Sequence, residues 1–305
     1  EGEVSLIGGS INNTKLKKYF AKPDSNQMIN ILNDREYFSQ LIIKAKDLNI
    51  DTNIRFDKII KKDSNEILIG KNLGNKEILI RYLIPEDSYS ITREIIVKNN
   101  SSKNFIFRFF EESIGEVLAQ EYYDFGYYNG DEVENIDSTP SEPKKEIDDI
   151  SWFGFSKKYF LVANLIETAG EKTLKYEKKS TNLLRTVVSH KTINLLGNGQ
   201  YSMVSDIFLG PKDYKILSQY GSLEKAHDLG WFDWLASPLE QLLNFSNKYI
   251  KNYGIAIIII TILIRILFLP LTVKSMMSMK KMQSKMALLK PKLDEIKEKF
   301  KDDKS

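Results

Sequence analysis

The sequence contains no cysteine and only two histidines, His190 and His227, among its 305 residues. The lack of cysteine excludes disulfides, thiolate metal sites and a cysteine nucleophile. Two histidines this far apart in the chain cannot build a metal cage alone, and they leave few bases for a catalytic triad. Walker loops, G-x-S-x-G, H-E-x-x-H and dinucleotide fingerprints are also missing. We therefore expect no covalent catalysis, no nucleotide hydrolysis, no metal, no cofactor and no small-molecule substrate.

Charge is distributed unevenly along a chain whose net charge is only +3. The first 230 residues carry 31 basic and 34 acidic side chains, whereas residues 231–305 carry 13 basic and 7 acidic ones. A mildly acidic body is thus joined to a basic tail, and this balance gives no indication of DNA binding. Because the chain begins with Glu1 and ends in a polar run, we expect it to be a fragment of a longer protein.

Residues 1–225 have the pattern of a β-rich domain, in which short apolar stretches are separated by polar turns. Many short strands of this kind predict a sandwich. Turn-forming runs in the middle of residues 67–83 and of residues 88–110 predict two hairpins. Residues 158–166 have the composition of a buried strand. Residues 129–150 contain proline, glycine and many acidic side chains, and they are predicted to form a solvated surface loop.

Residues 226–252 are predicted to form an amphipathic helix, because large apolar residues recur there at three- and four-residue steps. Ser237 and Pro238 have the residue types of a helix cap and first turn, so the helix could restart there. Trp231 and Trp234 lie near its beginning, and tryptophan is favoured at the boundary between membrane and water. We expect the helix to lie flat on a bilayer with these two tryptophans as anchors. The alternative is a helix packed on the β domain.

Residues 253–271 form an apolar run of 19 residues with one charge and eight isoleucines. As a helix the run would be about 28 Å long, close to the ~30 Å hydrocarbon core of a bilayer. A buried helix of a soluble protein seldom needs apolar residues on all its faces, so we predict a transmembrane helix. Residues 272–290 contain five lysines and no acidic residue. Since basic flanks stay in the cytoplasm, the β domain is expected outside and the tail inside.

Arg265 is the single charged residue of this apolar run. An arginine inside a membrane helix costs about 2.5–3.5 kcal/mol on insertion scales, and its guanidinium does not deprotonate. It must therefore either reach the membrane boundary or face a wet cavity. Thr261 lies four residues earlier on the same helix face. We favour a hydrophilic recess lined by both residues, which would lower the cost of moving a polar client segment across the bilayer.

The basic tail is rich in methionine, with five of the seven methionines lying between Met276 and Met286. Met279, Met282 and Met286 continue into a heptad-like seam, which predicts a coiled-coil-like helix that needs a partner helix. Pro291 is expected to kink or restart this helix. Since methionine adapts to varied apolar surfaces, the four methionines Met276, Met279, Met282 and Met286 are candidates for contacts with clients or with a partner helix. The lysines are suited to anionic lipid headgroups or ribosomal RNA.

The stretch from Gly230 to Lys304 resembles the YidC family of bacterial membrane-protein insertases. It contains the elements L-I-R, L-F-L-P-L-T, M-x-x-M-Q and K-P-K-L in the family's order. The upstream region is similar to the periplasmic domain of that family in a looser way. The similar positions there are Gly8-Gly9-Ser10-Ile11, Trp152 with Tyr159-Phe160, and Phe208-Leu209-Gly210-Pro211.

The resemblance implies the following division of the chain. Residues 1–225 would be a mainly β periplasmic domain, a β-supersandwich of the mutarotase-like kind, and residues 226–252 an interfacial helix. Residues 253–271 would be the first core transmembrane helix, and residues 272–305 the truncated first arm of a cytoplasmic helical hairpin. Residues 1–250 would then lie in the periplasm of a bacterium, and the protein would be located in the inner membrane.

The resemblance also implies that the protein is an insertase and chaperone, which inserts and folds inner-membrane proteins alone or with the Sec translocon. Its partners would be nascent membrane proteins, the ribosome, the translocon and the phospholipid bilayer, and Arg265 and Thr261 would match positions of the family's hydrophilic groove. The family has one further transmembrane helix before the periplasmic domain and four after the hairpin, and we expect these to be missing here. The alternative is a membrane-tethered sandwich that binds carbohydrate or acts as a scaffold for translocon partners. A carbohydrate site would need a cleft with His190 or His227 beside a carboxylate and aromatic rings.

Overall fold

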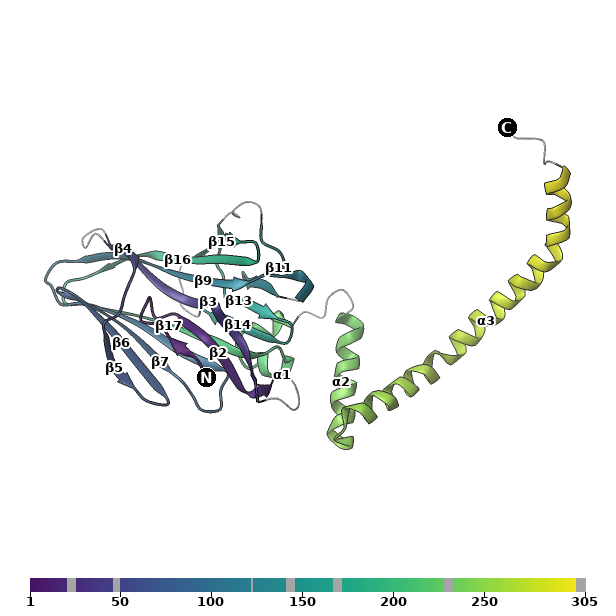
Figure 1. Cartoon of the computed structure of the whole chain (residues 1–305), viewed down its shortest axis with the longest axis horizontal. Helices are drawn as coiled ribbons and strands as arrows, with labels where there is room; N and C mark the ends of the chain where they lie inside the picture. Colours follow the sequence, from purple (N-terminus) through teal and green to yellow (C-terminus); the bar gives the residue numbers. More distant parts are fainter. Residues whose placement is uncertain are drawn as a thin grey trace. The chain divides into compact units, whose positions relative to one another are not determined.

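The computed structural model describes residues 1–20, 26–45, 50–121, 123–140, 146–166, 172–227 and 233–299. The chain divides into two compact units, residues 1–227 and residues 228–305. The first unit is built almost entirely of β-strands and is called the β domain below (purple to green in Figure 1). The second unit contains two long helices, α2 (Asp233–Ile250) and α3 (Tyr253–Lys299).

The β domain consists of two antiparallel sheets, which confirms the predicted mainly β sandwich. The eight-stranded sheet has the order β1 (Glu3–Val4), β2 (Ile11–Phe20), β3 (Met28–Ala45), β9 (Phe105–Glu116), β16 (Leu183–Leu195), β15 (Lys172–Ser180) and β12 (Ile147–Asp148), with β4 (Ile50–Asn53) paired to β3. The nine-stranded sheet has the order β11 (Val133–Ile136), β10 (Asp124–Tyr128), β13 (Trp152–Lys157), β14 (Phe160–Leu165), β17 (Gln200–Pro211), β8 (Ser90–Asn99), β7 (Lys76–Leu83), β6 (Glu66–Leu73) and β5 (Lys58–Lys62).

Alternate side chains of the strands form the core between the sheets. In β9, Phe105, Phe107 and Phe109 point inward and are at most 1% exposed, whereas Ile106 between them is 50% exposed. This two-residue period is what a strand with one buried face requires. The ring centroids of Phe107 lie 5.0 Å from those of both Phe105 and Phe109. Aromatic pairs at this separation add about 0.5–1.5 kcal/mol beyond the area that they bury.

One of the two predicted hairpins is confirmed. Strands β6 and β7 pair over their whole length, and Gly74, with a φ of 62°, forms the tight turn between them. Glycine suits this position because it adopts positive φ without a steric penalty. The strands are longer than expected, because Gly70 and its neighbours continue β6 instead of forming the turn.

The second predicted hairpin, at residues 88–110, is wrong. Strand β8 pairs with β7 and β17 in the nine-stranded sheet, whereas β9 pairs with β3 and β16 in the eight-stranded sheet. The polar run therefore carries the chain from one sheet to the other. Asn99 organises this crossing, since its buried side-chain amide donates to the carbonyl oxygens of Lys103 (2.8 Å) and Leu196 (2.9 Å). A turn-forming run shows where a strand ends but not which strand becomes its neighbour.

The predicted buried strand at residues 158–166 is confirmed as β14, whose residues are all buried between β13 and β17. The prediction of a solvated loop at residues 129–150 is wrong in part. Strand β11 pairs with β10 there, because its end residues Val133 and Ile136 pack against apolar clusters of the domain. Residues 141–145 lie outside the described part of the chain.

A second, smaller core lies on the other face of the nine-stranded sheet. We call residues 212–227 the clasp; it contains the helix α1 (Tyr214–Leu217) and the 3-10 helix η3 (Leu223–Ala226). Leu217 and Leu223 of the clasp are fully buried against Trp152 of β13 and its neighbours. The indole N–H of Trp152 donates to the carbonyl oxygen of Ser222 at 3.1 Å. The last residues of the β domain are thus fixed to the sheet by packing and by a buried hydrogen bond.

Helices α2 and α3 meet at a well-defined corner. Lys251 has a φ of 54°, and its N–H donates to the carbonyl oxygen of Asn247 at 2.8 Å, which ends α2 in a left-handed residue. The side-chain oxygen of Asn252 then accepts from the N–H groups of Gly254 (2.9 Å) and Ile255 (3.3 Å) and so caps α3.

This corner gives a pair of predictions with opposite sign. We expect Asn252→Ala to destabilise the helical unit by about 1 kcal/mol, because the first turn of α3 loses its cap. We expect Lys251→Gly to be neutral or to stabilise it by up to about 1 kcal/mol, because glycine adopts positive φ more readily than lysine. Thermal unfolding of the chain in detergent, followed by its helical circular dichroism, measures both. A Lys251→Gly variant that melts lower than Asn252→Ala would contradict this description of the corner.

Three prolines lie inside the helices. The predicted restart of the helix at Ser237 and Pro238 is wrong, since α2 begins at Asp233 and runs through Pro238. A proline near the start of a helix removes only one backbone hydrogen bond, so the helix can continue through it. Helix α3 runs through both Pro270 and Pro291 without a restart.

Candidate functional site

Thr261 and Arg265 lie one turn apart on α3, as the sequence predicted from their spacing. The hydroxyl of Thr261 donates to the carbonyl oxygen of Ile257 at 2.7 Å, so its hydrogen is used within the helix. The guanidinium of Arg265 therefore provides the strong donors of this face. The chain has no acidic residue between Tyr253 and Leu293, so no carboxylate of this part of α3 can neutralise the charge of Arg265.

The two buried residues of α3 lie on a different side of the helix from Arg265. Ala256 is 0% and Ile260 is 7% exposed, whereas every described side chain from Arg265 to Pro291 is exposed. At about 100° per residue, Thr261 and Arg265 point roughly away from Ala256 and Ile260. The polar face of the helix is thus uncovered in the described part of the chain.

Helix α3 is long and apolar enough to cross a membrane, judged by its length and composition. Its most apolar 18-residue window has a mean hydropathy of 2.7, and only 11% of that window is buried. A core helix of a soluble protein would be mostly buried. The low burial of so apolar a helix is what a helix surrounded by lipid would show.

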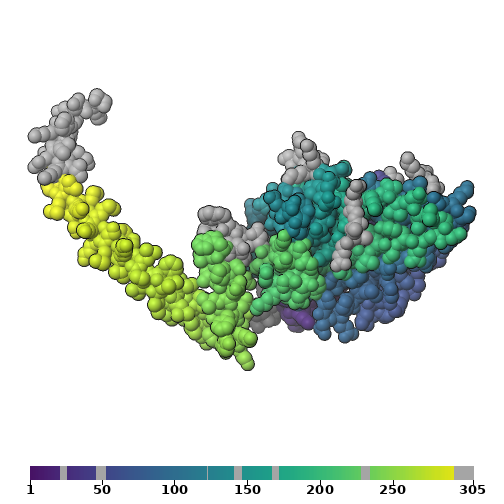
Figure 2. All heavy atoms as spheres, turned by 180° about the vertical axis from the view of Figure 1, so that it is seen from behind, coloured from purple at the N-terminus to yellow at the C-terminus, as the bar shows by residue number. Residues whose placement is uncertain are grey.

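The predicted methionine contacts lie on the exposed part of α3. Met276, Met279, Met282 and Met286 are between 58% and 66% exposed. Figure 2 shows this part of α3 in yellow-green, with no second described helix beside it. The predicted anchor Trp234 is 74% exposed at the start of α2, and the other predicted anchor, Trp231, lies outside the described residues.

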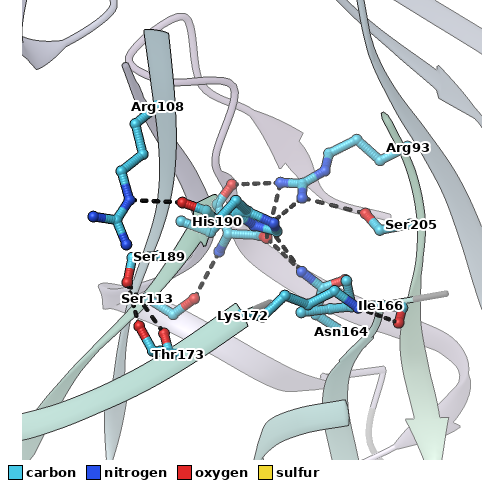
Figure 3. Close-up of polar contacts among 12 residues, drawn as sticks. Arg93, Arg108, Ser113, Asn164, Ile166, Lys172, Thr173, Ser189, His190 and Ser205 are labelled. Atoms are coloured by element: carbon cyan, nitrogen blue, oxygen red, sulfur yellow. Dashed lines mark hydrogen bonds and ion pairs between the residues drawn. The ribbon is translucent and has the colours of Figure 1, made fainter. Parts of the chain in front are cut away.

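A buried polar cluster lies between the two sheets of the β domain, centred on the carboxylate of Glu111 in β9. Figure 3 labels Arg93, Asn164 and His190 among its members. The Oε2 atom of Glu111 accepts from the guanidinium of Arg93, from Ser39 Oγ (2.6 Å) and from Asn164 Nδ2 (2.9 Å). Its Oε1 atom lies 2.8 Å from His190 Nε2, which must donate because an ionised carboxylate only accepts. Four donors from four different strands therefore converge on one carboxylate.

Two irregularities of the eight-stranded sheet aim side chains at this carboxylate. The register between β3 and β9 shifts between Tyr37 and Gln40, and Ser39 within the shift has a φ of 60°. The register between β9 and β16 shifts between Ser189 and Thr192, where His190 lies. Such bulges re-aim side chains, and a non-glycine residue at positive φ stores strain. Both neighbours of β9 are thus distorted where they face Glu111.

The cluster shifts the pKa of its ionisable groups. Burial by itself would raise the pKa of Glu111, but the guanidinium of Arg93, together with His190 and Ser39, outweighs burial and holds this pKa well below its usual range. Burial lowers the pKa of Lys172 at the edge of the cluster, and the carboxylates of Glu111 and Asp149 oppose this change. The ammonium of Lys172 donates to the carbonyl oxygen of Ile166 at 3.0 Å.

The hypothesis of a carbohydrate site required a cleft with a histidine beside a carboxylate and aromatic rings, and His190 beside Glu111 provides the pair. However, Glu111 is 0% exposed and both its oxygens accept from protein donors, so no position is left for a substrate. His227 lies in the clasp, where its Nδ1 atom is 3.1 Å from the carbonyl oxygen of Lys212. The sequence interpretation missed Glu111, although it follows Phe105, Phe107 and Phe109 on the inward face of β9.

A cleft of about 540 Å³ lies beside β2, bordered by the connection between β7 and β8. Lys18 on β2 and Asp87 on the connection are 3.7 Å apart across it, and the hydroxyls of Tyr19 and Tyr89 are 3.1 Å apart. The volume is typical of small-ligand sites. Lysines and carboxylates both line the cleft, so it favours neither sign of charge in a ligand.

The fold and the helices together define the class of protein. A β-sandwich followed by an amphipathic helix and by an apolar helix that the described residues leave uncovered is typical of a membrane-anchored domain. Residues 1–242 match the family model described as the YidC periplasmic domain, and residues 245–305 match the one described as 60Kd inner membrane protein. The chain belongs to the YidC family, which confirms the resemblance seen in the sequence.

Curated relatives carry the name membrane protein insertase YidC. The chain is 44% identical over 182 residues to the protein of Syntrophus aciditrophicus and 42% identical over 178 residues to that of Geotalea daltonii. These matches cover 58% and 57% of this chain but only 32% and 33% of the relatives. The chain thus matches about a third of their length. A galactose mutarotase-like protein from Lactobacillus casei is a structural neighbour, with 10% identity, a TM-score of 0.44, and coverage of 68% of this chain and 96% of that protein.

Proposed function

We propose that this chain is part of an insertase and chaperone that inserts and folds proteins in the bacterial inner membrane. The observation that carries the proposal is Arg265, a permanent cation on the uncovered face of an apolar helix. Membership of the YidC family and the name of the curated relatives support it. The activity needs neither covalent chemistry nor nucleotide hydrolysis, in keeping with the residues available in the chain.

The proposed mechanism is local polarity within the bilayer. An apolar medium strengthens the attraction between a cation and an acidic or polar client segment, because the dielectric constant there is low. Arg265 would thus stabilise such a segment half-way across, while Thr261 one turn away adds a polar oxygen to the same face. The barrier for carrying the segment across falls by the free energy of these contacts.

The proposed topology places the β domain and the interfacial helix α2 (Asp233–Ile250) in the periplasm. The sequence prediction began this helix at residue 226, but Ala226 belongs to the clasp and the β domain ends at residue 227. Residues 253–271 span the inner membrane, and residues 272–305 extend into the cytoplasm as the hairpin arm. The five lysines after the span support this orientation, since basic flanks remain in the cytoplasm. Trp231 and Trp234 would anchor the interfacial helix in the headgroup region.

The exposed methionines Met276, Met279, Met282 and Met286 are proposed to contact either the second arm of the hairpin or nascent membrane proteins arriving from the ribosome. The flexible thioether side chain fits apolar partners of varied shape. The Sec translocon is a further proposed partner in the handling of clients.

Cysteine labelling tests the wet recess directly. This chain contains no cysteine, and any cysteine elsewhere in the complete protein is replaced by serine beforehand. In the complete protein, reconstituted in vesicles, we expect a membrane-impermeant maleimide to modify Arg265→Cys and Thr261→Cys at least about tenfold faster than Leu263→Cys. Leu263 is a matched control, because it lies on the same turn of α3 but points roughly away from Arg265. Equal, slow labelling at all three positions would show that the Arg265 face is as dry as the opposite side of the helix.

A membrane-tethered sandwich that binds carbohydrate or acts as a scaffold for translocon partners remains the alternative function. The buried state of Glu111 and His190 disfavours sugar conversion at that pair. Specific binding of a sugar to the chain at micromolar concentration would favour the alternative over the insertase.

A further inference from the structure

We propose that Glu111 is an acid-sensitive latch that holds the two sheets of the β domain together. The proposal rests on the position of one carboxylate between the layers of the sandwich. Arg93 on β8 and Asn164 on β14 reach Glu111 from the nine-stranded sheet, and Ser39 on β3 and His190 on β16 reach it within the eight-stranded sheet. Figure 3 shows the side chains of Arg93, Asn164 and His190 pointing toward one another.

The negative charge of Glu111 is what makes these contacts compatible with burial. Arg93, Glu111, Ser39 and Asn164 are all 0% exposed. A buried guanidinium is stable only when a counter-charge accompanies it. Arg93 also donates to the carbonyl oxygen and hydroxyl of Ser39 (both 2.8 Å) and to Ser205 Oγ (3.2 Å), but these acceptors are neutral. If Glu111 lost its charge, the cation would stay buried without compensation.

The remaining polar groups of the cluster do not replace the carboxylate. Arg93 Nε and Asn164 Oδ1 have no hydrogen-bond partner among the described residues. A buried polar network with unsatisfied hydrogen-bonding groups is costly. The stability of this cluster therefore depends on its strongest contact, the ion pair between Arg93 and Glu111. The strained backbone of Ser39, at a φ of 60°, is also held in place by this network through its hydroxyl and carbonyl oxygen.

Other ionisable groups surround the latch. Arg93 and Tyr82 face Glu111 from the nine-stranded sheet, and His190 and Lys172 face it from the eight-stranded sheet. Asp149 faces Lys172 from beyond the end of β12. Burial raises the pKa of Tyr82 to about 12, so its hydroxyl stays neutral at neutral and acidic pH. None of these groups is a carboxylate in contact with Glu111, so none can take over its negative charge.

The sign of the pH dependence follows from the lowered pKa of Glu111. A carboxyl that is more acidic in the folded state stabilises the fold fully above its ordinary pKa, and this contribution is lost as the pH falls through the folded value. The ordinary value is 4.5, so the latch should begin to weaken below about pH 5 and continue to weaken towards pH 2. In this window the ratio of folded to open domain falls by up to about tenfold per pH unit from this one group.

Hydrogen exchange of the full chain in detergent micelles tests the latch, with protection factors corrected for the intrinsic effect of pH. We expect Glu111→Gln, which keeps the shape but removes the charge, to lower protection at pH 7 by at least about 100-fold in strands of both sheets, including β8, β9 and β14. Between pH 5 and pH 3 the protection of this variant should fall less steeply than that of the wild type. The difference between the two slopes should reach up to about tenfold in protection per pH unit.

The chain offers a matched control one residue along the same strand. Glu112 points to the opposite face of β9, where it accepts from Tyr37 and from Arg185. We expect Glu112→Gln to keep protection at β8 and β14 within about threefold of wild type at pH 7. If Glu112→Gln lost as much protection in β8 and β14 as Glu111→Gln does, the proposal would be overturned. The loss would then not depend on a carboxylate placed between the two sheets.

A double variant keeps the proposal testable if Glu111→Gln does not fold. Arg93→Met with Glu111→Leu replaces the ion pair by apolar side chains, which often preserves a fold. We expect this variant to regain protection to within about tenfold of wild type at pH 7 and to lack the steep acid loss. A double variant that folds but loses protection in acid as steeply as the wild type would show that another group is responsible. Wild-type-like protection of either sheet in Glu111→Gln would also overturn the latch.

Discussion

Arg265→Ala in the complete protein should lower the insertion rate of single-span clients with acidic outer tails by about tenfold or more. A central charge in a membrane helix is worth about 2.5–3.5 kcal/mol on insertion scales, and a recess that returns half of this to the client accounts for about tenfold in rate. Protease protection of the client tail in reconstituted vesicles measures the rate. We expect Arg265→Lys to keep a substantial part of the activity, because attraction requires positive charge more than the planar fork of arginine.

The controls separate the membrane site from general loss of charge. Arg35 is exposed on β3, far in sequence from the helical unit, and Arg35→Ala removes the same charge from the β domain. It should leave insertion unchanged. If clients insert at the normal rate with Arg265→Ala, the proposed groove role is wrong for this protein. An equal loss with lysine and alanine at position 265 would instead mean that the hydrogen-bonding geometry of the guanidinium is required.

Trp152→Ala should lower the free energy of unfolding of the β domain by about 3–5 kcal/mol. The indole is 2% exposed, lies in the small core under the clasp and donates to the carbonyl oxygen of Ser222 at 3.1 Å. Its removal leaves a cavity beneath Leu217 and Leu223 and abolishes that bond. Denaturant unfolding of the chain in detergent, followed by the β-sheet circular dichroism, measures the change. We expect the clasp to become sensitive to limited proteolysis at lower denaturant concentrations than the sheets.

A second tryptophan, Trp234, provides the control for Trp152→Ala. Trp234 is 74% exposed on α2, so Trp234→Ala should change the unfolding free energy of the β domain by less than about 0.5 kcal/mol. Trp152→Phe should be intermediate, since it keeps most of the buried ring but loses the hydrogen bond, which is worth about 1 kcal/mol. Similar losses for Trp152→Ala and Trp234→Ala would argue against the clasp as a packed part of the domain.

Features with a local cause were predictable from the sequence. The two-residue period of β9 and the glycine turn of the β6–β7 hairpin follow from side-chain alternation and backbone freedom. The apolar run after Tyr253 predicts a helix, because a chain surrounded by lipid must satisfy its backbone hydrogen bonds within itself. The family motifs around Arg265 lie within residues 245–305, which match the family model.

Features that depend on pairing between distant segments were not predictable. Residues after Asn99 looked like a hairpin turn, yet β8 and β9 belong to different sheets because their neighbours come from β17 and β16, about 100 residues later. The same holds for the polar cluster. Arg93, Glu111 and His190 are each unremarkable in the sequence, and only the sandwich brings them together. A glutamate at an inward position of β9 was the one local signal of the cluster.

The continuity of α3 has a mechanical consequence. Helix α3 runs from Tyr253 to Lys299 as one element, so the apolar segment and the methionine-rich segment share one axis and one rotational phase. A partner that twists the methionine-rich segment about this axis would turn Arg265 in the same direction, less the part of the twist that is taken up at Pro270. Pro270, which lacks the backbone N–H that stiffens the helix, is the point between the two segments where such torque would be absorbed.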